Sequence, residues 1–125
     1  MVNPITDART DLLNTLEGTT TYTYDGWIER LNTPCLVVAP DTPYVVLGER
    51  YGEKEIRLRV FMVVKHSASL SKANSDLDAL IDKTLDTLSE TYATGEVEQP
   101  EAFTIGNTNY LGTSLQITIE RSSTQ

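Results

Sequence analysis

The stretch EIRLRVFMVVKH, residues 55–66, decides the fold of this chain. Its even-numbered positions from Ile56 to Val64 are all apolar, whereas its odd-numbered positions are charged up to Arg59, apolar at Phe61 and Val63, and charged again at Lys65. Strict alternation is typical of a strand with one buried face, and β-branched side chains fit a pleated surface. We therefore predict a central strand that helix covers on one face and that a partner covers over only part of the other.

A helix is predicted before this strand, over residues 4–17. Asn3 suits the capping position, and Pro4 suits the first helical turn because its missing N–H would be unpaired there anyway. Apolar residues then recur at helical spacing up to Leu16, and Gly18 can end the helix in the left-handed conformation.

A second helix is predicted after the strand, over residues 75–92. Leucines recur there at three- and four-residue steps, which is the clearest helical pattern in the chain. Asn74 or Ser75 would cap this helix, and Gly95 would end it. Its apolar face should cover the central strand.

Shorter strands and turns are predicted elsewhere. Strand propensity or apolar alternation marks residues 19–24, 35–40, 44–47 (an edge strand or extended loop) and the C-terminal strands within about 102–121, where Gly112 suggests a bulge. Residues 41–43 are expected to form a turn, and residues 96–101 a polar link. Together these elements predict one α+β domain over residues 1–125, with two helices packed on a mixed or antiparallel sheet of about four to five strands.

Composition narrows the classes of function. The 125 residues carry 18 acidic and 10 basic side chains, a formal net charge of −8, which disfavours tight contact with nucleic acid or an anionic membrane. No apolar run reaches the length of a spanning helix, and the N-terminus lacks the pattern of a signal peptide. The single cysteine allows no intramolecular disulfide. We expect a protein made in the cytoplasm.

Few residues suggest chemistry. Asp78, Asp82, Asp86 and Glu90 are four apart, so they could bind a metal or act as acid and base, but they more simply form the solvated face of a helix. A stripe of one sign could also serve as an electrostatic surface.

The remaining candidates are single residues. His66 has no second histidine beside it, and Cys35 reads as a small buried hydrophobe. Trp27 and Tyr51 either close over the core or lie at an interface. No catalytic constellation is present in the pattern, so we expect a non-enzymatic protein without metal or cofactor.

Two segments are candidates for contact with other subunits. Arg57 and Arg59, beside Lys65, would form either a wet patch paired with the acidic surplus or a subunit interface. The polar segment GERYGEK, residues 48–54, would protrude as a loop or hairpin. Its candidate docking residues are Arg50, Tyr51, Gly52, Glu53 and Lys54.

Four phrases of the sequence support a family resemblance. They are PCLVVAPDTPYVV at 34–46, GERYGEKEIRLRV at 48–60, LDALIDKTLDTL at 77–88 and YLGTSLQITIE at 110–120. Together they resemble the tail terminator (tail completion) proteins of long-tailed bacteriophages, or siphoviruses, over nearly the whole chain. The loop tip RYGEK and the surroundings of Trp27 match nothing diagnostic.

The resemblance implies a structural virion protein at the neck of the phage. Two helices would pack on a mixed sheet, and about six subunits would form a ring on the head-proximal end of the tail tube. The ring would stop tube polymerisation, bind the tail tube protein and a head-completion protein, and let DNA pass through its lumen. Assembly would occur in the host cytoplasm. The acidic residues Asp78, Asp82, Asp86 and Glu90 would then line the lumen or face solvent, since a negative channel repels phosphate.

Two other interpretations stay open. One is a head-closure or adaptor protein of the phage neck, which would dock on the portal side and not on the tube. The other, of a different class, is a small acidic ligand-binding module, a monomer or dimer with a pocket near His66 and the acidic helix. Ring formation would distinguish the terminator and the neck connector from the ligand-binding module. Binding to tail tube protein would distinguish the terminator from the connector.

Overall fold

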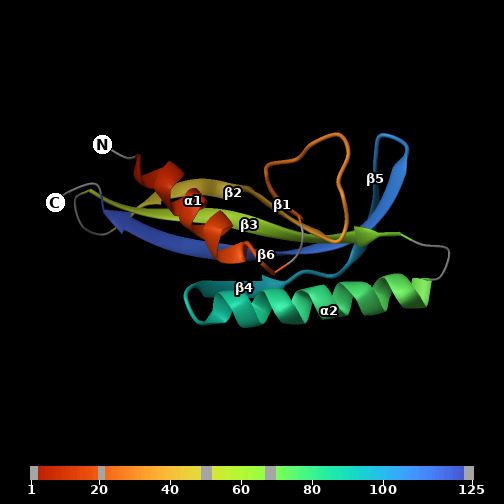
Figure 1. The fold of residues 1–125 in the computed structure, drawn as a ribbon. Helices are drawn as coiled ribbons and strands as arrows, with labels where there is room; N and C mark the ends of the chain where they lie inside the picture. Colours follow the sequence, from red (N-terminus) through yellow and green to blue (C-terminus); the bar gives the residue numbers. More distant parts are fainter. Residues whose placement is uncertain (1–2, 20–21, 49–51, 67–69, 123–125) are drawn as a thin grey trace.

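A computed structural model describes residues 3–19, 22–48, 52–66 and 70–122 of the chain. Two helices pack against a six-stranded mixed sheet in this part, so the fold is α+β as predicted, with slightly more strands than expected (Figure 1). In chain order the elements are α1 (Pro4–Leu16), β1 (Tyr22–Asp25), β2 (Cys35–Leu47), β3 (Glu53–Lys65), α2 (Leu70–Ser89), β4 (Ala93–Val97), β5 (Glu101–Ile105) and β6 (Thr108–Ser122).

The strand order β1-β2-β3-β6-β4 places β3 in the middle of the sheet, as its alternation predicts. β1 runs parallel to β2, and all other pairs are antiparallel. β5 pairs with residues 108–112 of β6, and β4 pairs farther along β6 with residues that include Leu115 and Thr118. The long β3–β6 ladder runs without a break in register and is the frame on which the side chains below are placed.

Helix α1 begins where the sequence predicts and ends one residue earlier. The Asn3 side chain accepts hydrogen bonds from the backbone N–H groups of Ile5 and Thr6, at 2.9 and 3.3 Å. These bonds satisfy donors that the first helical turn leaves without partners. After the helix, Gly18 has a φ of +90°, which residues with a side chain rarely adopt.

Both helices cover one face of the sheet. The even-numbered residues of β3 from Ile56 to Val64 are buried there, together with apolar residues of α1, α2, β2 and β6. The α1 contribution comes from Ala8, Leu12 and Leu16. In Figure 1, α2 runs alongside the strands, while α1 crosses them obliquely. This layer is the main apolar core.

The opposite face of the sheet carries a smaller cluster at one end only. This cluster is buried where the β1–β2 loop and β5 cover the sheet. Its residues are Leu31, Cys35, Val37, Val63 and Tyr110. Figure 1 shows that loop and β5 on the side of the sheet away from α2. The chain's own segments therefore cover the apolar end of this face, whereas its charged end stays open.

Helix α2 is shifted toward the N-terminus of its predicted range, residues 75–92. Asn74 and Ser75 lie inside the helix and do not cap it, because the buried stripe begins one turn earlier, at Ala73. At the other end the N–H groups of Thr91 and Tyr92 both donate to the carbonyl oxygen of Leu88 and close the final turn.

Residues 93–97 then form an edge strand, where we predicted the helix end at Gly95 and the start of a polar link. The free edge of β6 supplies backbone partners, and Ala93 and Thr94 pair with Thr118 and Ile117. Backbone hydrogen bonding along an open strand edge thus outweighed the weak local preference of ATGEV.

Strand β2 is one strand and not two segments with a turn between them. Its pairing with β3 slips between Pro40 and Val45, which places residues 41–43 in a bulge of residues 41–44 within the strand. Pro40 and Pro43 have no N–H group to donate to a neighbouring strand, so the ladder is interrupted there without ending.

Gly112 is not a bulge, although its position in a strand suggested one. It pairs in register with both Val63 and Glu101. A Cβ at Gly112 would lie 2.9 Å from Cε1 of Phe103 and 3.1 Å from the carbonyl oxygen of Met62. The glycine is therefore required by a close approach of neighbouring groups.

Candidate functional site

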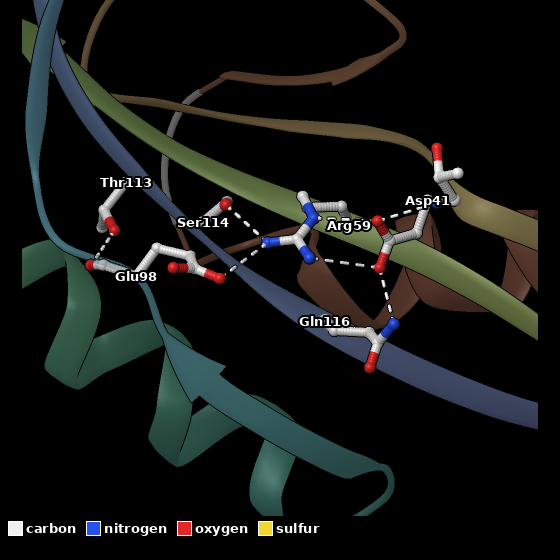
Figure 2. Close-up of polar contacts among 7 residues, drawn as sticks. Asp41, Arg59, Glu98, Thr113, Ser114 and Gln116 are labelled. Atoms are coloured by element: carbon white, nitrogen blue, oxygen red, sulfur yellow. Dashed lines mark hydrogen bonds and ion pairs between the residues drawn. The ribbon is translucent and has the colours of Figure 1, made fainter.

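Arg59 holds together the open, charged end of the sheet (Figure 2). Its guanidinium reaches the Asp41 carboxylate from β3 with two contacts, Nε to Oδ1 at 3.1 Å and Nη2 to Oδ2 at 3.2 Å. Asp41 lies in the β2 bulge, and its side chain is only 10% exposed. The fork of an arginine matches the two oxygens of a carboxylate, so this pair is well oriented.

Strand β6 and the segment after β4 complete this network. Gln116 donates from Nε2 to Oδ2 of Asp41 at 2.6 Å, and Arg59 donates from Nη1 to Oγ of Ser114 at 3.0 Å. The same Nη1 lies 3.6 Å from a Glu98 carboxylate oxygen. Thr113 donates to the backbone carbonyl of Glu98 (Figure 2). The arrangement links β2, β3, β6 and the chain after β4.

The Asp41 carboxylate stays ionised in this network. Burial raises its pKa, but hydrogen bonds from Arg59, the backbone N–H of Thr42 and Gln116 outweigh burial and hold the pKa below its ordinary value. The pair is therefore a charged structural contact and not a proton donor at neutral pH.

The structure does not bring the three predicted interface residues into one patch. Arg57 pairs with Glu55 within its own strand, at 2.7 Å, and Arg59 is engaged as described above. Lys65 lies at the far end of β3, is exposed, and is separated from both arginines by Phe61 and Val63. Both arginines pair with carboxylates of their own chain, as one of the two alternatives predicts, and the subunit interface stays a prediction.

An aromatic cleft adjoins the network on the same face. The Trp27 ring meets Phe61 edge-on at 4.8 Å and Phe103 at 5.8 Å between ring centroids. The cleft has a volume of about 360 Å³ and is rimmed by Glu98 and Glu101. Trp27 packs on Phe61 and Phe103 and remains 43% exposed, so it closes over this end of the sheet, and its role at an interface stays a prediction.

The predicted acidic surface is present on α2. Asp78, Asp82 and Asp86 are exposed along one flank of the helix, and Glu90 is exposed just beyond its end. None of the four forms a salt bridge with another residue that the structure describes. The flank therefore presents uncompensated negative charge to solvent.

The other flank of α2 carries a basic surface that sequence reasoning missed. Lys72 and Lys83 line a hollow of about 640 Å³ together with Lys65. We call this the lysine hollow; residues of α2, the end of β3 and the loop before β2 form it. The eleven-residue step between the two helical lysines is about three turns, so their shared flank could have been read from the sequence.

The predicted docking loop is described only in part. Arg50 and Tyr51 lie outside the described residues. Gly52 has a φ of +82°, and Glu53 and Lys54 belong to strand β3 and not to a loop. The N–H of Gly48 donates to the carbonyl oxygen of Glu53, so β2 and β3 form a hairpin here.

The structure also describes the surroundings of Cys35 and His66. Cys35 is fully buried, and burial raises the pKa of its thiol to about 12, so it is the inert hydrophobe that the sequence predicts. His66 lines a small pocket of about 220 Å³ with residues such as Phe103 and Asn109. The residues that line this pocket include none of the acidic helix residues.

The described ranges contain no candidate metal site and no candidate membrane-spanning helix. No group of three or more His, Cys, Asp or Glu side chains is placed there to hold a metal ion. No helix there is long and apolar enough to cross a bilayer. Neither a protein-family model nor a curated protein matches this chain.

Proposed function

We propose that this protein is a non-enzymatic structural subunit of a phage virion, a tail terminator. Copies would form a ring, of about six subunits, that caps the head-proximal end of the tail tube and stops its growth. The ring would bind the tail tube protein on one side and a head-completion protein on the other. It would act in the neck of the assembled virion.

The observation that supports the proposal best is the asymmetry of α2. Its acidic flank is exposed over three helical positions from Asp78 to Asp86, and no described cation neutralises it. A channel for DNA requires such a surface, because fixed negative charge repels phosphate and prevents the counterion release that drives binding. In the proposed ring this flank faces the lumen.

The Arg59 network supports a mechanical role. It connects three strands and the segment after β4 with charge-assisted hydrogen bonds on the face that the helices leave open. Such a face keeps its shape without a covering layer. A ring subunit needs that rigidity, since small errors in each contact add up around the circle.

The test is reconstitution with the tail tube protein of the phage that encodes this chain. Tube subunits polymerising in its presence should give shorter tubes, with a ring visible at one end in negative stain. A matched reaction without the protein gives the uncontrolled length. Tubes of unchanged length without added density would contradict the terminator function, and binding to portal assemblies would favour the neck connector.

The aromatic cleft is the observation that favours a different function, the small ligand-binding module. Its volume of about 360 Å³ is within the range of small-molecule sites, and its lining includes the aromatic rings of Trp27, Phe61 and Phe103. Trp27 is the sole tryptophan, so ligand screening by intrinsic fluorescence reports on this cleft directly. A compact dimer without a pore, together with a saturable fluorescence change, would support this function over the ring.

A further inference from the structure

The positive charge of this acidic chain is distributed unevenly. Four arginines are neutralised by carboxylates of the same chain, in the pairs Arg9–Asp25, Arg57–Glu55, Arg59–Asp41 and Arg121–Asp11. Lys65 and Lys83 form no salt bridge with a residue that the structure describes. Lys65 and Lys83 therefore give the lysine hollow uncompensated positive charge, and Arg30, next to Glu29 in the loop before β2, likewise forms no salt bridge with a described residue.

The lysine hollow also has an apolar base. Val64 and Leu80 line it together with Ala79 and Pro34, and among its described lining residues Asp76 is the one acid. Its volume of about 640 Å³ is large enough for one or two bulky side chains. A fitting partner would thus carry exposed apolar side chains surrounded by carboxylates.

A surface of that chemistry exists elsewhere on the same chain. Trp27 and Ile28 are 43% and 44% exposed, and they are two of the four large hydrophobic side chains exposed in the described part. Glu29 lies beside them in a shallow depression, and Glu101 lies on the rim of the cleft that Trp27 lines. We call these four residues the Trp27 patch. Neither glutamate forms a salt bridge with another described residue.

The two surfaces lie on opposite faces of the sheet. The Trp27 patch lies over Phe61 on the face away from the helices, and the lysine hollow lies between α2 and Val64 on the helix face. One copy therefore cannot fill its own hollow. A contact between different patches of two copies is head-to-tail, and such contacts close into rings when the rotation between copies permits.

We propose that the lysine hollow of one copy binds the Trp27 patch of the next copy. Trp27 and Ile28 enter the hollow, and Lys65 and Lys83 face Glu29 and Glu101. Tryptophan is enriched among residues that dominate interface energy, and opposite charges at the rim favour this register over others. The inference rests on the proposed function, because it names the contact that would build the ring. It leaves the acidic flank of α2 free to face the lumen.

The test uses two charge-reversed variants, K65E/K83E and E29K/E101K. Light scattering over concentrations up to about 1 mM should show wild-type mass rising with concentration, while the Trp27 emission moves to shorter wavelength. Each variant alone should need at least about tenfold higher concentration to associate. An equimolar mixture should associate again, because reversed lysines meet reversed glutamates.

Two further variants separate this contact from general effects of charge and folding. D82K/D86K changes the net charge as much as E29K/E101K does, but on the acidic flank, and should associate like wild type. I28D removes apolar contact at an exposed position and should prevent association. Circular dichroism confirms that each variant is folded.

Three results would overturn the contact. They are a wild type that stays monomeric at every concentration, a folded charge-reversed variant that associates normally, and a mixture that is not restored. The proposed function would be judged separately, since reconstitution with tube protein measures tube length and does not depend on this interface. Normal tube termination by a folded K65E/K83E variant would reject the contact and keep the function.

Discussion

The two faces of β3 are held in different ways. On the helix face, five successive even-numbered residues from Ile56 to Val64 are apolar and nearly or fully buried under α1 and α2. On the other face, Phe61 and Val63 lie under a loop and β5, while Arg59 is fixed by the Asp41 carboxylate and the Ser114 hydroxyl. The comparison teaches that burial supplies stability on one side, and directional polar contacts keep the exposed side in shape.

The largest expected effect is a cavity on the helix face. Leu58 is fully buried, and Leu58→Ala should lower the free energy of unfolding by about 2–5 kcal/mol, through lost burial and an unfilled cavity. Urea unfolding measures the change. Leu47→Ala is the matched control, because Leu47 is 79% exposed, and it should change stability by less than about 0.5 kcal/mol. Equal effects would refute the assigned burial.

On the charged face, removal of Asp41 should cost less. Asp41→Ala deprives Arg59 and Gln116 of their shared acceptor and should lower stability by about 1–3 kcal/mol. The comparison variant is Glu55→Ala, which breaks the more exposed pair with Arg57 and should cost at most about 1 kcal/mol. If the two variants unfold at the same urea concentration, the network has no special role.

The close approach at Gly112 offers a test at the apolar end of that face. Gly112→Ala should lower stability by about 1–3 kcal/mol, since the new methyl group would press on Phe103 and on a backbone carbonyl. In a Phe103→Ala background the same substitution should cost clearly less. Strict additivity in this double-mutant cycle would show that the two residues do not collide.

Acid should weaken the charged face selectively. The folded-state pKa of Asp41 is lowered, so its contribution is present above the ordinary carboxyl pKa near 3.8 and is lost as pH falls through the folded value. Part of the stability that wild type loses on acidification should therefore be absent from Asp41→Asn already at neutral pH. This loss should be smaller than that of Asp41→Ala, which removes the side chain. Unfolding curves between neutral pH and about pH 3 measure it. Parallel pH profiles of both proteins would contradict this.

The smallest expected effect concerns the acidic flank of α2. D82K/D86K makes two of the three like-charge pairs four residues apart attractive, those with Asp78 and Glu90, and leaves positions 82 and 86 alike, so it should raise stability by a few tenths of a kcal/mol, roughly 0.2–0.5 per converted pair. The same variant should make an assembled ring retain DNA in a gel-retardation assay, whereas the wild-type ring should not. A ring of the variant that still ignores DNA would place this flank away from the lumen.

Sequence patterns predicted best what depends on neighbours along the chain. The alternation in residues 55–66 identified the central strand, and Asn3 and Pro4 identified the start of α1. The pattern erred where distant segments decided the outcome. Residues 93–97 became a strand because β6 offered an open edge, and residues 41–43 became a bulge because β2 continues to pair with β3 on both sides of them.

The candidate sites divide in the same way. Exposure of Asp78, Asp82 and Asp86 follows from helical spacing and was predictable. The partner of Arg59 was not, because Asp41 and Gln116 are 18 and 57 positions away in the chain and meet it only through strand pairing. The pairing places Arg59 in contact with a carboxylate of its own chain, and its role at a subunit interface stays a prediction.

The sequence alone determined the α+β class, the central strand and the amphipathic helices, because each follows from the periodicity of side chains over a few turns or residues. The tertiary structure alone decided which charges are neutralised and which remain available. Strand pairing neutralised the arginines of the open face, and helix packing left lysines on one flank of α2 and aspartates on the other. That selection depends on three-dimensional distance, because Coulomb energy and hydrogen bonding act between atoms that are close in space.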